Sequence, residues 1–199
     1  MEPKGWYRRY LPHCDQPGAV QFVTFCLADA WGTREPEQWY VMTEKERFQW
    51  REEALDRAYG SCALGQAAIA GALAAMIQKR DPDEYALHGW VIMPNHVHLL
   101  IQVTSGQPLH RVIGKLKGES GFHANRLLGL RKQFWGHGFW DRYIRDERHF
   151  DAALHYTEWN PVRGGLCQKP EDWPSGSAAV RHALQTANKS RAPMGREFL

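Results

Sequence analysis

The sequence predicts an α+β fold, a ferredoxin-like sandwich in which an antiparallel sheet carries its helices on one face. Residues 85–93 and 96–103 read as strands and are joined by the turn signal Pro94-Asn95, which indicates a β-hairpin. Helix-like segments separate this hairpin from a strand near the start of the chain and from a short late strand. We expect this order to leave the second face of the sheet open for a ligand.

Each of the other elements has its own local signal. Residues 19–27 are rich in β-branched and aromatic side chains, which favour a strand. A helix over 43–59 is predicted from the capping box of Thr43 and Glu46, and Gly60 ends it. Apolar spacing and local turn or capping signals predict the remaining elements: helices over 65–79 and 107–128, a short strand at 143–145, and a helix from Asp146 to about Trp159 that Pro161 terminates.

Length and composition fit a single domain. We expect residues 1–180 to form it and residues 181–199 to be a loosely packed C-terminal tail. Apolar residues make up 43% of the 199-residue chain, which is enough for a hydrophobic core. The four cysteines include no Cys-x-x-Cys pair, and no uncharged apolar run reaches the roughly 18 residues of a membrane span. We therefore expect a soluble protein of the cytoplasm.

Charge is distributed unevenly along the chain, although the net charge is only +3. Residues 29–56 hold eight acidic and four basic residues, whereas residues 111–163 hold ten basic and six acidic ones. Basic side chains beside aromatic rings suit single-stranded nucleic acid, because phosphates need neutralising and bases stack on flat rings. The candidates for such contacts are Arg111, Lys115, Arg142 and Arg145 with an exposed Trp135, Phe139 and Trp140; filling of the core is the alternative role of these aromatic residues.

His96 and His98 are the most informative pair of residues. They lie in the predicted strand 96–103 with one apolar residue between them, so both side chains point to the same face of the sheet. Two imidazoles on a rigid strand form half of a site for a divalent metal ion. A third ligand is needed, because two imidazoles seldom hold a catalytic metal ion alone. The alternative is that both histidines are ordinary surface or packed residues.

Tyr156 and Asn160 are four residues apart on the predicted last helix and therefore share a face. Phe150 and Leu154 mark the adjoining face that packs on the sheet, so Tyr156 lies at the edge of the buried stripe. Its simplest role is that of a half-buried aromatic residue with its hydroxyl in water. Asn160 precedes Pro161, and its simplest role is to end the helix.

In combination, these motifs resemble the REP-associated tyrosine transposases of the HUH superfamily, where REP denotes repeated extragenic palindromes. The resemblance covers roughly residues 6–180 and rests on the order of several motifs. They are His96-Val97-His98 within Met93–Leu100, Phe134-Trp135, Asp141–Asp146, Tyr156-x-x-x-Asn160-Pro161 and Trp173-Pro174-Ser175.

The resemblance implies a ferredoxin-like fold and an enzyme, dependent on Mg²⁺ or Mn²⁺, that cleaves and rejoins single-stranded DNA at REP hairpins. By this resemblance His96 and His98 match the family's metal-binding pair. Asn160 matches the polar residue that supplies a third ligand, and Tyr156 matches the nucleophile that forms a 5′-phosphotyrosine link. The implied partner is DNA near the nucleoid, without a membrane, and the implied oligomeric state is a monomer or a homodimer.

Two other functions stay open at this point. A non-catalytic ferredoxin-like protein could bind single-stranded nucleic acid by stacking bases on the same sheet. A metal-dependent hydrolase could use a bound water, with Tyr156 in a purely structural role. A covalent adduct between protein and DNA would distinguish the transposase-like enzyme from both.

Overall fold

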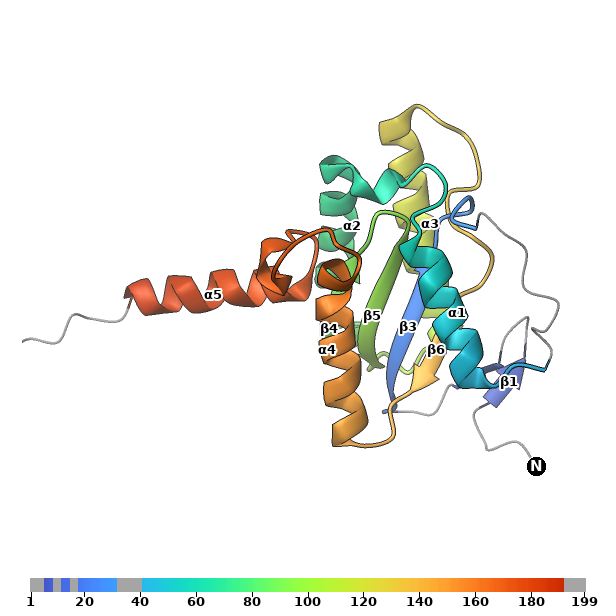
Figure 1. The fold of residues 1–199 in the computed structure, drawn as a ribbon, viewed down its shortest axis with the longest axis horizontal. Coiled ribbons are helices and arrows are strands. Elements are labelled where there is room, and N and C mark those ends of the chain that lie inside the picture. The colour runs from blue at the N-terminus through green and yellow to red at the C-terminus, as the bar shows by residue number, and fades with distance from the viewer. Residues whose placement is uncertain (1–5, 9–11, 15–17, 32–40, 192–199) are drawn as a thin grey trace, which may run out of the picture.

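Four antiparallel strands form the main sheet of the computed structural model, in the order β4-β5-β3-β6 (Figure 1). They are β3 (Val20–Cys26), β4 (Tyr85–Ile92), β5 (His96–Val103) and β6 (Trp140–Tyr143). The structure describes residues 6–8, 12–14, 18–31 and 41–191, and the first two segments pair as β1 (Trp6–Arg8) and β2 (Pro12–Cys14). The predicted α+β class with an antiparallel sheet is confirmed.

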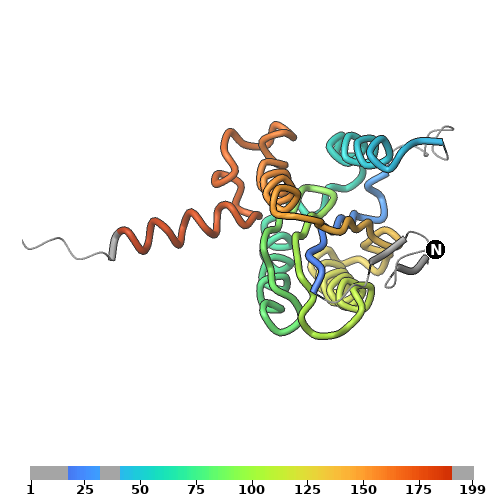
Figure 2. Tube along the Cα trace, turned by 90° about the horizontal axis from the view of Figure 1, so that it is seen from below, coloured from blue at the N-terminus to red at the C-terminus, as the bar shows by residue number. Residues whose placement is uncertain are grey.

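Helices α2 (Ala67–Lys79) and α3 (Leu109–Leu128) cover one face of this sheet (Figure 2). The succession β3-α2-β4-β5-α3-β6 is the βαββαβ order of a ferredoxin-like fold. Val97, Leu99 and Ile101 of β5 alternate toward this side and join the main hydrophobic core. The hairpin of β4 and β5 and the two amphipathic helices therefore lie where the hydrophobic pattern predicts them.

The opposite face of the sheet is not open, which corrects the prediction that all helices lie on one side. Helices α1 (Glu44–Asp56) and α4 (Glu147–Arg163) lie over it (Figure 2). Phe22 of β3 and Leu100 of β5 form a second, smaller core with Leu154 of α4 and other apolar residues of the two helices. Because the central strands are apolar on both faces, both faces must be covered. The face that carries His98 is therefore enclosed between the sheet, α1 and α4.

Several of the predicted boundaries differ from the structure. Helix α1 ends at Asp56 rather than near residue 59, strand β6 spans 140–143 rather than 143–145, and α4 continues through Pro161 to Arg163. Proline is tolerated there because it lies in the last turn, where it removes only one helical hydrogen bond. Within the predicted tail from 181, residues up to 191 belong to helix α5 (Ser177–Arg191), and residues 192–199 lie outside the described part.

Short connections complete the fold. The 3-10 helix η2 (Ala63–Gly65) leads into α2, and η3 (Pro170–Asp172) lies between α4 and α5. Ser177 joins α5 to the body, because its hydroxyl accepts a hydrogen bond from the N–H of Trp90 at 3.1 Å and donates one to Glu158 at 2.8 Å. Among the described residues, no helix is both long and apolar enough to cross a bilayer.

Candidate metal and nucleophile site

His96 and His98 project from β5 toward α1 and α4 and form the centre of the candidate site. Both imidazoles are almost completely buried, at 1% and 0% exposure. Their Nε2 atoms lie 3.1 Å apart. The prediction that the two side chains share one face of the sheet is confirmed.

The ring orientation of His96 is set by Asn95. The Nδ2 group of Asn95 donates to the carbonyl of Leu55 at 3.1 Å, which leaves its Oδ1 facing Nδ1 of His96 at 2.7 Å. Because Oδ1 can only accept, Nδ1 of His96 carries the proton and Nε2 keeps a lone pair. Burial and the neighbouring His98 lower the pKa of His96 to about 3. His96 is therefore neutral at physiological pH, as a metal ligand must be.

His98 is held from two sides. Its Nδ1 lies 2.8 Å from the hydroxyl of Thr24, the residue paired with it on β3. Its ring stacks on Phe22, with centroids 5.1 Å apart. A hydrogen bond at Nδ1 and a stacked ring fix the direction of Nε2, which is how supporting residues orient the imidazoles of metal sites.

Helix α4 brings Tyr156 and Asn160 to this pair of histidines. The Nδ2 group of Asn160 lies 3.3 Å from Nε2 of His98. Oδ1 of Asn160 is buried and has no hydrogen-bond partner. The half-buried ring of Tyr156 lies edge-on to His98, with centroids 5.7 Å apart. The four residues selected from the sequence therefore meet in one place.

Glu52 of α1 is a fifth member of the site that the sequence analysis did not identify. Its side chain is 3% exposed and accepts a hydrogen bond from the hydroxyl of Tyr156. The same oxygen lies 3.3 Å from Nε2 of His98. Five of the 13 residues of α1 are acidic, including the neighbouring Glu53, so no local signal distinguishes Glu52.

The surroundings shift the pKa of the Tyr156 phenol and that of the Glu52 carboxylate in opposite directions. Burial, together with Glu52, raises the pKa of Tyr156 well above its usual range, and Arg163 opposes this shift. Burial alone would raise the pKa of Glu52, but His98 and the hydrogen bonds from His98 and Tyr156 outweigh burial and keep it below its usual range. At neutral pH a protonated phenol therefore faces an ionised carboxylate.

The donor set at this point suits a divalent cation. In the described ranges, no three His, Cys, Asp or Glu side chains are arranged as a metal cluster, so a site would have to be mixed. Two imidazole nitrogens and the unpartnered amide oxygen of Asn160 are such a mixed set. Nitrogen and oxygen donors together accommodate Mn²⁺ or Mg²⁺. The residues present fit the metal that the resemblance implies.

Only some of the residues that were predicted to contact DNA lie on the same side of the sheet as this site. Arg142 and Trp140 lie on β6 opposite Phe22 and Thr24, and so on the same face as His98. Arg145 is exposed just before α4, whereas Arg111 and Lys115 are exposed on α3, on the other side of the sheet. Lys115 is also paired with Glu84 at 2.6 Å.

The expectation that Trp135, Phe139 and Trp140 are exposed is wrong for Trp135 and Phe139, and Trp140 is half-buried. Trp135 and Phe139 are 6% and 5% exposed and belong to the main core. The indole N–H of Trp135 donates to Ser120 at 3.1 Å, and its ring packs edge-on to Phe25. Core filling therefore describes Trp135, and its predicted role as a DNA-stacking residue loses its basis.

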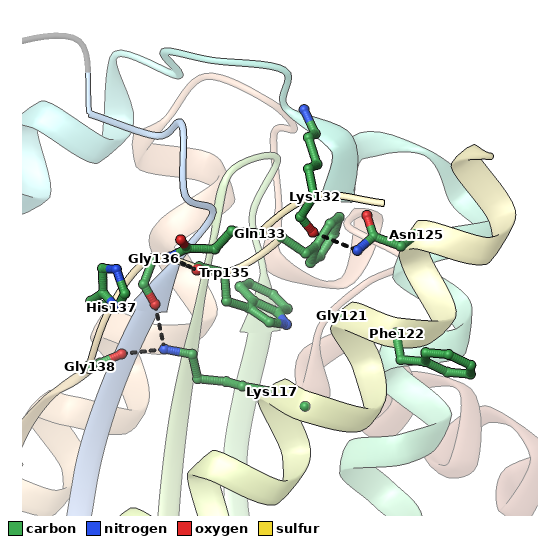
Figure 3. A pocket seen from close by; sticks show the side chains of 12 residues that line it. Lys117, Gly121, Phe122, Asn125, Lys132, Gln133, Trp135, Gly136, His137 and Gly138 are labelled. Atoms are coloured by element: carbon green, nitrogen blue, oxygen red, sulfur yellow. Dashed lines mark hydrogen bonds between the residues drawn. The ribbon is translucent and has the colours of Figure 1, made fainter. Parts of the chain in front are cut away.

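A shallow open pocket of about 370 Å³ lies between α3 and the segment 132–138 (Figure 3). Lys117 reaches across it and donates to the carbonyls of Gly136 and Gly138. The pocket lies on the α3 side of the sheet, away from His98 and Tyr156. The amine of Lys117 is already hydrogen-bonded to these two carbonyls, so it is not a ready ligand-binding group in the pocket.

Comparison with known proteins bears on the same residues. Residues 66–145, which include both histidines of the site, match the family described as "Transposase IS200 like". A putative REP-associated tyrosine transposase of Haemophilus influenzae is 30% identical over 96 residues, covering 43% of this chain and 54% of the relative. The predicted resemblance to the REP-associated tyrosine transposases is confirmed. The REP-associated tyrosine transposase of Escherichia coli K12 is 26% identical over 100 residues, covering 50% of this chain and 58% of the relative.

A solved structure of a REP-associated tyrosine transposase bound to a REP hairpin is similar to this one over nearly its whole length. It has a TM-score of 0.54 and 19% identity, and the match covers 96% of this chain and 93% of that chain. At this identity the likeness concerns the fold. The chain spans a little over half the length of the curated REP-associated tyrosine transposases it matches.

Proposed function

We propose that this protein is a metal-dependent endonuclease and strand transferase that cleaves and rejoins single-stranded DNA through a 5′-phosphotyrosine intermediate. One observation carries the proposal: a tyrosine hydroxyl, an amide oxygen without a partner and two imidazoles lie together in one enclosed place. A nucleophile beside a ready set of metal ligands is what a phosphoryl transfer by a protein side chain requires.

The reaction exchanges one phosphodiester for another. Oη of Tyr156 attacks the phosphorus, a new phosphorus–oxygen bond forms, and the 3′ oxygen of the DNA leaves as a hydroxyl. The phenol proton has an acceptor in place, because the hydroxyl already donates to Glu52. A cation held by His96, His98 and Asn160 would polarise the phosphate oxygens and stabilise the leaving oxygen. Because both ends of the exchange are phosphate esters, the same site can rejoin the strands.

Arginine side chains beside the tyrosine suit a phosphate backbone. The guanidinium of Arg163 lies over the ring of Tyr156, 4.7 Å from its centroid. Arg142 lies 4.9 Å from the ring centroid of Phe48, and Arg51 lies 5.2 Å from that of Trp140. The Nε group of Arg51 is buried without a hydrogen-bond partner. This group of cations and rings supports a single-stranded DNA as the substrate.

A hairpin of a REP element is the proposed form of that DNA. The support comes from the structurally similar REP-associated tyrosine transposase, whose structure is bound to a REP hairpin. The site also requires only one copy of this chain, since α4 places Tyr156 beside the histidines of the same chain. A monomer is therefore sufficient for the proposed reaction.

The test is a search for the covalent intermediate. The full chain is incubated with a labelled single-stranded hairpin and Mn²⁺, and the products are separated by denaturing electrophoresis. We expect a labelled protein band with the wild type and with Tyr59→Phe, a control in which an exposed phenol outside the site is removed. We expect none with Tyr156→Phe. Cleavage by Tyr156→Phe at the wild-type rate would contradict the proposal, and binding without cleavage by the wild type would favour a non-catalytic DNA-binding protein.

A further inference from the structure

Glu52 is a buried carboxylate with more than one contact in the site. One oxygen accepts the hydroxyl of Tyr156 and lies 3.3 Å from Nε2 of His98. The other oxygen, Oε1, is buried without any hydrogen-bond partner. A carboxylate oxygen that is buried without a partner has lost its hydration without replacement, and a cation beside it would supply the missing contact.

Apart from Glu52, the side chains that hydrogen-bond to the two imidazoles are uncharged: Thr24, Asn95 and Asn160. Oδ1 of Asn95 can only accept, so it leaves Nε2 of His96 with a lone pair for a cation. A divalent cation bound only by imidazole and amide groups would be an enclosed positive charge without a counter-ion, which is unfavourable. The carboxylate of Glu52, which lies 3.3 Å from Nε2 of His98, is placed to be that counter-ion.

From this we infer that Glu52 supplies the buried negative charge of the cation site. The inference rests on the proposed function, because the cation is itself part of that proposal. It assigns a role to α1, the helix that lies between β3 and α2 in the chain and outside the βαββαβ succession. The position of Glu52 on α1 brings its carboxylate to His98 from the side opposite Thr24.

The other charged side chains near Glu52 do not contact its unpartnered oxygen. Asp56 lies one turn further along α1 and is itself acidic; burial, followed by the negative charge of Glu52, raises its pKa. Arg163, the cation beside these groups, lies over the ring of Tyr156 and acts on Asp56 by lowering its pKa. Arg51 is the other nearby cation, and its guanidinium lies over the rings of Phe48 and Trp140. None of these groups contacts the unpartnered oxygen of Glu52.

The experiment measures Mn²⁺ binding directly, by the loss of the electron paramagnetic resonance signal of free Mn²⁺ on titration with the full chain. Glu52→Gln removes the charge but keeps an oxygen that can accept from Tyr156. Glu53→Gln makes the same change on the exposed side of α1 and is the matched control. We expect Glu52→Gln to weaken Mn²⁺ binding by at least about tenfold, and Glu53→Gln and Tyr156→Phe to change it by less than about threefold.

Equal affinity of Glu52→Gln and the wild type would overturn the inference while leaving the metal-dependent function intact, provided that His98→Ala abolishes binding. Absence of Mn²⁺ binding by the wild type would overturn both. Thermal unfolding gives a second measurement. Mn²⁺ should raise the melting temperature of the wild type and of Glu53→Gln, and should raise that of Glu52→Gln by less. Equal stabilisation of Glu52→Gln and the wild type by Mn²⁺ would contradict the inference.

Discussion

Gly89 of β4 and Leu154 of α4 approach so closely that a Cβ atom at residue 89 would lie 2.6 Å from Cδ1 of Leu154. A Cβ atom there would force the Leu154 side chain to move, so the absence of a side chain at Gly89 lets α4 pack close to β4. Tyr156 and Asn160 are carried by the same helix, two and six residues beyond Leu154. This contact is therefore one of those that hold the phenol close to the histidines of β5.

We predict that Gly89→Val lowers the yield of covalent adduct at least tenfold while the chain stays folded, because the added methyl groups push α4 outward. A displacement of about 1 Å is enough to cost a hundredfold in a positioned reaction. The double variant Gly89→Val with Leu154→Ala should recover much of the loss, since the smaller side chain makes room. Adduct yield by electrophoresis and folding by circular dichroism are the measurements. Additive losses in the double variant would show that this contact does not position α4.

His98→Ala should abolish metal-dependent cleavage, with a loss of at least a hundredfold, because it removes one of two imidazole ligands and the contact to Asn160. His155→Ala is the matched control on the exposed side of α4 and should cleave as the wild type does. The rate of hairpin cleavage is measured over a range of Mn²⁺ concentrations. If cleavage persists in His98→Ala, or if EDTA leaves the wild type active, the proposed metal role is wrong.

The sequence predicts the sheet and its covering helices well where a single local pattern decides the outcome. The strand 96–103 is correct to the residue, because alternation and the Pro94-Asn95 turn define it. The capping box at Thr43 likewise places the start of α1 correctly. The second covered face was missed, since α1 is only weakly amphipathic and its packing depends on the tertiary contacts of Phe48 and Leu55.

The residues of the candidate site also differ in whether the sequence could predict them. His96, His98, Tyr156 and Asn160 could be selected because their spacing on a strand and on a helix has a geometric meaning. Glu52 could not, because burial of one glutamate among five acidic residues of α1 is decided only when that helix docks on the sheet. The burial of Trp135 was a matter of tertiary packing for the same reason.

Cysteine labelling tests the burial of β3 independently of activity. Cys26 is 3% exposed, and burial raises the pKa of its thiol to about 11, whereas Cys62 and Cys167 are half-buried. At pH 8 a thiol of pKa about 11 is ionised in roughly one molecule per thousand, and a thiol reacts through its ionised form. We predict that iodoacetamide modifies Cys62 and Cys167 first and reaches Cys26 only after denaturation. Mass spectrometry of the peptides measures this, and equal rates for Cys26 and Cys62 would contradict the fold.

The salt dependence of DNA binding distinguishes the two groups of basic residues. Arg142 shares the face of the sheet that carries His98, whereas Arg111 lies on α3 across the sheet. If Arg142 contacts a phosphate, Arg142→Gln should reduce the slope of the logarithm of the binding constant against the logarithm of salt concentration by about 0.7, the value for one phosphate contact on a single strand. Arg111→Gln removes the same charge and should leave the slope unchanged. Fluorescence anisotropy with a labelled single strand between 50 and 200 mM salt, roughly the range in which such slopes are measured, gives both values. A reduced slope in Arg111→Gln with none in Arg142→Gln would place the DNA on α3 and away from Tyr156.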